Sequence, residues 1–222
     1  MQRVRRADEF ERRVKNPAER LAAALDAPLA ALGFVPRALP RPKAADFRKL
    51  LAAYTRTHRG FEQSVSIASF GGNAFDVGIA IRHDAIDQLV DRWITQIPGR
   101  EGPTYSFGLR ALEGERSASY HLAGPEDFAS FLDLLAQRLP SWPDRLADFA
   151  ALDARMQASY ATTPLIEHGL KRRAALLAGA ALAGHADMAG LLAASTNTEK
   201  VMEQYQGLLE ELGRMELAAA PT

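Results

Sequence analysis

Five polar side chains in the middle of the chain could together form a binding site: Arg110, His121, Asp76, Ser66 and Ser119. Each lies in a segment where apolar and polar residues alternate, which is typical of a β-strand with one buried face. Alternation places all five on the face opposite the apolar one. A guanidinium, an imidazole and a carboxylate on one face can together hold a charged or hydrogen-bonding ligand. These residues support the hypothesis of a ligand-binding groove on this second face, beside the alternative of an ordinary face.

The second face is otherwise made of small residues, and this has two interpretations. Glycine and serine inside strands often mark the close approach of another backbone or a ligand. An ordinary solvent face, or a face covered by the C-terminal helices, explains the same pattern and is the more common outcome. The small and polar residues in question are Ser64, Ser66, Ala68, Asp76, Gly78, Ala80, Arg82, Ser106, Gly108, Arg110, Ser119 and His121.

Sequence motifs for catalysis, metals and cofactors are missing, so we assign no catalytic residue, no metal site and no cofactor. The chain contains no cysteine, which removes thiolate nucleophiles and thiolate ligands together. None of the five histidines has the spacing of a zinc site. Gly71-Gly72 lacks the lysine and hydroxyl residue of a phosphate loop, and a hairpin turn explains it better.

Two β-hairpins must position the five candidate residues. Residues 61–69 and 74–82 alternate on either side of Gly71-Gly72-Asn73, which predicts a three-residue loop with a left-handed residue in it. Ile67 then pairs with Val77. Residues 105–111 and 118–122 predict a second hairpin turning at residues 114–115, which sets Arg110 opposite Ser119 and His121 opposite Gly108.

Helical patterns surround these hairpins. Asn16 and Glu19 predict a capped helix to residue 32 that Pro28 kinks or splits, and Gly33 ends it. A proline-rich loop over 35–43, a short helix over 44–53 and an edge strand over 54–57 follow. Further helices are expected over 84–97, 125–139 and 144–160, and over 164–183 and 186–194 with a turn at Gly184. A last helix over 198–217 has near-heptad spacing; it favours packing on its own domain over a homodimer seam.

The composition restricts the classes of partner that the sequence predicts. Lysine plus arginine and aspartate plus glutamate both number 27, so the formal net charge is zero. No global field attracts nucleic acid or an anionic membrane. The alanine-rich window over 174–194 contains His185 and Asp187 and indicates a packed helical hairpin, not a membrane span. The missing cysteines and the lack of an apolar leader predict a cytoplasmic protein.

Three short strings resemble a bacterial family of small α+β proteins classified as a domain of unknown function. They are Leu32-Gly33-Phe34, residues 63–67 and residues 75–79, and the likeness extends from Leu29 to about Leu139. The resemblance implies a small cytosolic α+β protein, and similar proteins are suspected immunity or toxin-neutralising proteins. It implies no catalytic residue. The segment 36–43 and the helices after Tyr160 depart from the family pattern.

The sequence predicts an α+β protein with an antiparallel sheet of four to five strands from two hairpins, packed by helices. We expect an α+β domain over residues 1–160 and a helical C-terminal segment over 161–222. Two functions stay open. The first is a non-enzymatic protein-interaction module, immunity-like, with one protein partner or a homodimer. The second is a small-molecule enzyme or binding protein that uses the polar sheet face around Arg110 and His121.

Overall fold

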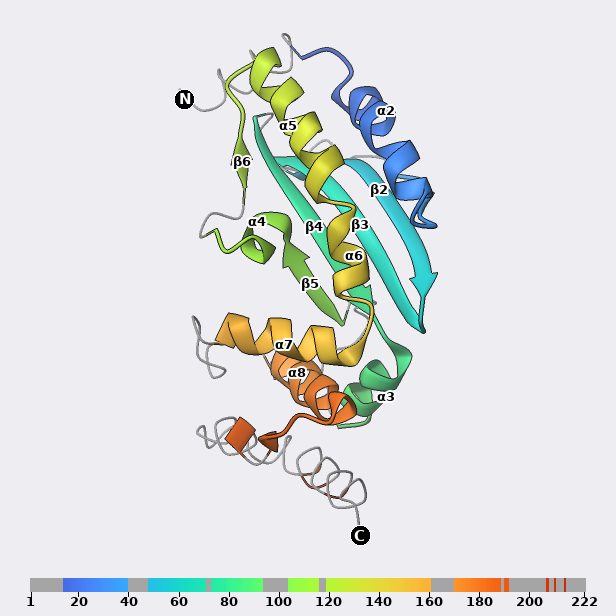
Figure 1. Ribbon diagram of the computed structural model, residues 1–222, viewed down its shortest axis with the longest axis vertical. Coiled ribbons are helices and arrows are strands. Elements are labelled where there is room, and N and C mark those ends of the chain that lie inside the picture. The colour runs from blue at the N-terminus through green and yellow to red at the C-terminus, as the bar shows by residue number, and fades with distance from the viewer. Residues whose placement is uncertain are drawn as a thin grey trace. The chain divides into compact units, whose positions relative to one another are not determined.

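The computed structural model is a mixed structure of helices and one antiparallel sheet, as predicted (Figure 1). It describes residues 14–39, 48–70, 73–93, 104–115, 119–160 and 170–191 except 189, together with 207, 210 and 214. The chain divides into two compact units. The first comprises residues 1–58, 62–81 and 106–144, and the second comprises 59–61, 82–105 and 145–222.

The sheet has the strand order β1-β2-β3-β4-β5, and β6 also pairs with β4. The strands are β1 (Val35–Pro36), β2 (Arg48–His58), β3 (Phe61–Phe70), β4 (Ala74–Arg82), β5 (Tyr105–Gly108) and β6 (Tyr120–His121). β1 pairs antiparallel with β2 through Val35 and Thr55, and β6 pairs antiparallel with β4 through Tyr120 and Phe75.

Two tight hairpins form the centre of the sheet. β2 and β3 are joined by Arg59 and Gly60, which both have positive φ, at 52° and 81°, as a type I′ turn requires. β3 ends and β4 begins on either side of residues 71–73, so the predicted three-residue spacing is confirmed. Gly71 and Gly72 lie outside the described residues, so the left-handed residue in this loop stays a prediction.

Helices cover one face of the sheet in the first unit (Figure 1). They are α2 (Pro17–Ala30), α5 (Pro125–Arg138) and the short α6 (Ser141–Arg145). Phe75 on β4 packs against Phe128 and Phe131 of α5, with ring centroids 5.7 and 5.5 Å away. The apolar positions of β3 and β4 that alternation predicted are buried under these helices. They include Val65, Ile67, Val77 and Ile79. We refer to the opposite side as the second face.

Several sequence predictions about elements are wrong. Residues 35 and 36, expected in a loop, form β1, and the helix expected over 144–160 is divided between α6 and a separate helix over Phe149–Tyr160. The short helix expected over 44–53 does not form over 48–53, because these residues belong to the 11-residue strand β2, and residues 44–47 lie outside the described residues. Leu51 and Ala52 are both buried, and such a run of consecutive apolar residues fits a buried strand as well as a helix. The second hairpin is also absent, because β5 and β6 each pair with β4 and the chain between them forms α4 (Leu109–Leu112). Leu109 and Leu112 are both buried at helical spacing.

The helix α2 tests three smaller predictions about how it begins, continues past Pro28 and ends. Pro28 lies inside the last turn without splitting the helix. Asn16 is left-handed (φ 49°) and does not cap; its side-chain amide instead donates to Glu19 Oε2 at 2.8 Å. Gly33 has a φ of 82°, and the Phe34 N–H donates to the Leu29 carbonyl, so the predicted glycine end of the helix is confirmed.

The second unit contains α3 (Asp84–Trp93), α7 (Phe149–Tyr160) and α8 (Leu170–Ala183). Its core includes Tyr105, whose hydroxyl donates to the Ala175 carbonyl of α8. The turn at Gly184 is present, with a φ of 68°. The predicted last helix falls almost entirely outside the described residues, and the domain boundary at residue 160 stays a prediction. Within the described part of the chain, no helix is long and apolar enough to cross a membrane.

Candidate functional site

Three of the five candidate residues lie on the second face. Ser66 is on β3 and Asp76 on β4, at positions that alternate with the buried Val65 and Val77. Ser66 lies beside Gly78, because a Cβ added there would be 3.2 Å from Ser66 Oγ. His121 pairs with Ala74, one residue from the Phe75–Tyr120 pair that faces the helices. The ligand-binding role of these residues stays a prediction.

Arg110 lies elsewhere, because the hairpin that was to place it on the second face does not form. Its guanidinium lies 5.1 Å above the ring of Tyr120 and binds the carboxylate of Glu115. Nη1 donates to the carbonyl of Ser119 at 2.6 Å. Burial and the carboxylates of Glu113 and Glu115 raise the pKa of Tyr120 to about 12. Arg110 and Ser119 therefore fix the chain between α4 and β6.

Asp76 has an unsatisfied oxygen. Its Oδ1 is buried and has no hydrogen-bond partner among the described residues, while the residue as a whole is half-buried. Buried polar atoms in folded proteins nearly always have a partner. This oxygen can accept a hydrogen bond from a ligand, or it can lower stability without a compensating role, and substitution distinguishes the two.

A groove of about 400 Å³ opens beside the first strands of the sheet. Besides Tyr54, whose hydroxyl donates to Asp26, its polar side chains are Arg37, Ser64 and Ser66, so it shares one residue with the predicted site. The remaining lining is mostly apolar. The complete lining is Arg37, Ala38, Leu39, Leu50, Ala53, Tyr54, Ser64, Val65 and Ser66.

The groove exists because a row of small side chains crosses the sheet. The Arg37 N–H donates to the Ala53 carbonyl at 2.8 Å, which sets these two residues opposite each other. The two-residue turn between β2 and β3 sets Ala53 opposite Ser66, and Ser66 lies beside Gly78. Three successive strands thus contribute no large side chain to the row, and the Arg37 side chain lies at its outer end.

Exposed apolar side chains flank Arg37. Among the described residues, the large hydrophobic side chains that are exposed are Val35 at 57% and Leu39 at 39%. Both belong to the five-residue segment Val35–Leu39, which we call the edge segment. Sequence reasoning missed it as a site because it lies in the proline-rich stretch interpreted as a loop. The signal for it was the apolar, basic, apolar spacing of Val35, Arg37 and Leu39.

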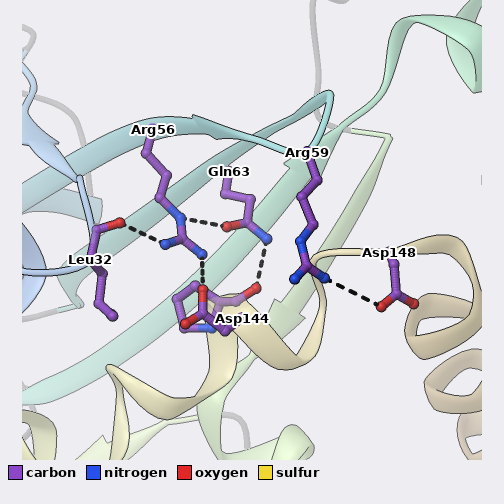
Figure 2. A network of polar contacts seen from close by, with 7 residues as sticks. Leu32, Arg56, Arg59, Gln63, Asp144 and Asp148 are labelled. Atoms are coloured by element: carbon purple, nitrogen blue, oxygen red, sulfur yellow. Dashed lines mark hydrogen bonds and ion pairs between the residues drawn. The ribbon is translucent and has the colours of Figure 1, made fainter.

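The helix-covered face holds a different polar cluster around Arg56 (Figure 2). Arg56 donates to Gln63 Oε1 at 2.8 Å, to the Leu32 carbonyl at 2.6 Å and to Asp144 Oδ1 at 2.6 Å. Gln63 in turn donates to the Pro143 carbonyl at 2.7 Å. Arg56 and Gln63 are both buried. All these groups are occupied by one another, so the cluster joins the sheet to α2 and α6 and leaves nothing for a ligand.

The second unit contains an imidazole–carboxylate pair. His185 Nδ1 lies 2.5 Å from Asp153 Oδ2, and both side chains are mostly buried. Such a pair can orient an imidazole as a general base, but no described hydroxyl bonds to the other ring nitrogen. The backbone N–H of His185 donates to the Ala180 carbonyl. The pair therefore ties α7 to the end of α8.

His83 and Asp87 have structural partners as well. His83 Nδ1 accepts from the Ala85 N–H at the start of α3, and its ring lies 4.7 Å from both Phe61 and Phe149. Thr104 donates to Asp87 Oδ1 at 2.8 Å. Among the described residues, no group of three or more histidine or acidic side chains could hold a metal ion.

The comparisons with known proteins add no family to this picture. No protein-family model, no curated protein and no solved structure matches the chain.

Proposed function

We propose that this protein is a non-enzymatic binding module that engages a partner protein through the edge segment and the groove beside it. One observation carries the proposal: the exposed large hydrophobic side chains of the described chain, Val35 and Leu39, both lie on the edge segment. Exposed apolar side chains gathered beside a concave site are typical of interaction surfaces.

The chemistry of the groove supports binding. Its lining offers a guanidinium and two hydroxyl groups among apolar walls. Such a lining can desolvate an apolar side chain and orient a polar one, which is how interface pockets hold their anchor residues. The same lining residues contribute neither an imidazole nor a carboxylate for acid–base chemistry.

A tagged pull-down from the native host at endogenous level, read by mass spectrometry, tests the proposal. Val35→Ser/Leu39→Ser is compared with Ala129→Ser/Gln137→Ser, which changes two exposed residues of α5. We expect a stoichiometric partner that the first variant loses and the second retains. A partner that both variants retain would rule out the edge segment.

A second function, the binding of a small molecule, is favoured by the size of the groove. Its volume of about 400 Å³ falls within the range of small-molecule sites. This function retains Ser66 from the predicted site and replaces Arg110 with Arg37. A metabolite screen by thermal shift on the wild type and Arg37→Ala tests it: a compound that stabilises only the wild type supports this function, and an empty screen counts against it.

A further inference from the structure

We infer that the groove selects an acidic segment of its partner, with a carboxylate on Arg37 and an apolar side chain on the floor of the groove. This inference rests on the proposed function and specifies the chemistry of the partner.

Basic side chains occur in the lining of the groove and directly before its lining residue Leu50. The Arg37 side chain is exposed, and its guanidinium makes no hydrogen bond or ion pair with another described residue. Arg48 and Lys49, both exposed, directly precede the lining residue Leu50. The lining contains no carboxylate, although acidic and basic residues are equally frequent in the chain. A planar guanidinium prefers the two oxygens of a carboxylate, which it can bind with two parallel hydrogen bonds.

The floor of the groove accepts an apolar side chain. Ala53 and the neighbouring Ser66 leave the space that larger strand residues would fill. Leu39 and Leu50 provide apolar walls. An apolar side chain placed here would lose water contact on several sides, which provides affinity. Ser64 and Ser66 can hydrogen-bond the backbone of the same segment.

The outer edge of the sheet disfavours the alternative in which the partner adds a strand. Because the Arg37 N–H faces β2, the backbone groups of its neighbours Pro36 and Ala38 face away from the sheet. Pro36 has no N–H, and proline on an edge strand is a common protection against strand pairing. The partner is therefore expected to bind through side chains.

Two synthetic peptides test the inference by NMR titration of the ¹⁵N-labelled full-length protein. The first peptide alternates glutamate and leucine, and in the second every glutamate is replaced by glutamine. We expect the acidic peptide to bind more tightly and to shift the amide signals of the edge segment and of Ser64 and Ser66. A loss of one charge-assisted hydrogen-bonded pair, worth about 1.5–3 kcal/mol, predicts that Arg37→Gln weakens its binding roughly 10- to 100-fold.

Arg59→Gln is the matched control, because Arg59 is an exposed arginine at the tip of the β2–β3 hairpin. It should bind the acidic peptide like the wild type. Arg37→Gln should no longer distinguish the two peptides, and about 0.5 M salt should weaken the wild type toward the same level.

Three results would overturn the inference. They are no binding of either peptide, equal binding of both by the wild type, and unchanged binding by Arg37→Gln. A fourth result would separate the two proposals. If Val35→Ser/Leu39→Ser loses a host partner, but Arg37→Gln and high salt do not release it, the proposed function stands and only the acidic preference is refuted. If succinate competes with the acidic peptide and binds with the same affinity, the ligand of the groove is a small dicarboxylate and not a partner protein.

Discussion

Replacing Arg56 with methionine should unfold the sheet at much lower denaturant concentration. Arg56 is 7% exposed, and its guanidinium supplies hydrogen bonds to Gln63, to the Leu32 carbonyl and to Asp144. It also lies 4.7 Å above the ring of Phe34. Methionine keeps the length and the apolar stem of the side chain, so the substitution removes the charge and the donors while largely preserving the packing.

The magnitude follows from what each partner loses. Gln63 is fully buried, so losing the Arg56 donor to its Oε1 costs about 1–3 kcal/mol, and the loss at the Leu32 carbonyl costs about 1 kcal/mol more. The lost cation–π contact adds roughly 0.5–1 kcal/mol. Asp144 is 57% exposed and returns to water, so the ion pair itself contributes little. We expect a total loss of about 3 kcal/mol in the free energy of unfolding.

Urea denaturation followed by far-UV circular dichroism measures this loss as a lower midpoint at an unchanged slope. Arg59→Met is the control, because Arg59 and Asp148 form a pair at 4.0 Å with both side chains more than half exposed (Figure 2). It should cost less than about 0.5 kcal/mol. Arg56→Met/Gln63→Leu should be no less stable than Arg56→Met, because it also removes Gln63 Oε1, although the Leu32 and Pro143 carbonyls then lose the donors that Arg56 and Gln63 supply. The reasoning fails if Arg56→Met costs no more than Arg59→Met, or if the double variant is the least stable.

Three further substitutions test other parts of the structure. Gly179→Ala should lower the free energy of unfolding by about 1–3 kcal/mol, because its Cβ would lie 2.3 Å from the Tyr105 hydroxyl oxygen. Adding Tyr105→Phe should reduce that loss. If urea denaturation shows that Gly179→Ala is as stable as the wild type, the packing of Gly179 against Tyr105 is contradicted. Asp76→Thr should raise the free energy of unfolding by about 1 kcal/mol, since it removes a buried oxygen that has no partner among the described residues and since threonine favours the strand. A loss of stability in the same assay would mean that the Asp76 carboxylate has a further partner. Tyr120 has its pKa raised from the ordinary 10.0 to about 12, so the folded state keeps a proton that the unfolded state releases, and stability should fall as the pH rises from about 10 toward 12. Midpoints measured over that range should fall less steeply for Tyr120→Phe, and identical slopes would refute this assignment.

The sequence predicted those elements whose pattern is local. The β3–β4 hairpin was predicted because alternation on both sides of a glycine-rich loop leaves a single register. The helices α3 and α5 were predicted from apolar stripes that are largely complete within each segment. For β2, alanine and leucine favoured a helix, and pairing with β1 and β3 overrode that preference.

The site was less predictable because it depends on contacts distant in the sequence. Ser66, Asp76 and His121 fall on the predicted face, since alternation within β3, β4 and β6 is enough to place them. Arg110 was misplaced because β6 pairs with β4 and not with the segment that contains Arg110. Arg37 was missed because its position depends on the pairing of Val35 with Thr55, 20 residues further along the chain, which no local pattern indicates.

The second face is a feature that the sheet's own stability does not explain. Glycine, alanine and aspartate are poor strand residues, and a face that needed only to meet water would favour threonine at these positions. Ala53, Ser66 and Gly78 form a row across three adjacent strands, and strand propensity does not favour these residue types there. The helix-covered side of β4 differs, since its positions are filled by Phe75, Val77, Ile79 and Ile81. A row of small residues that ends at an exposed arginine and at exposed apolar side chains is therefore better explained by the ligand or partner that it accommodates than by the fold that it weakens.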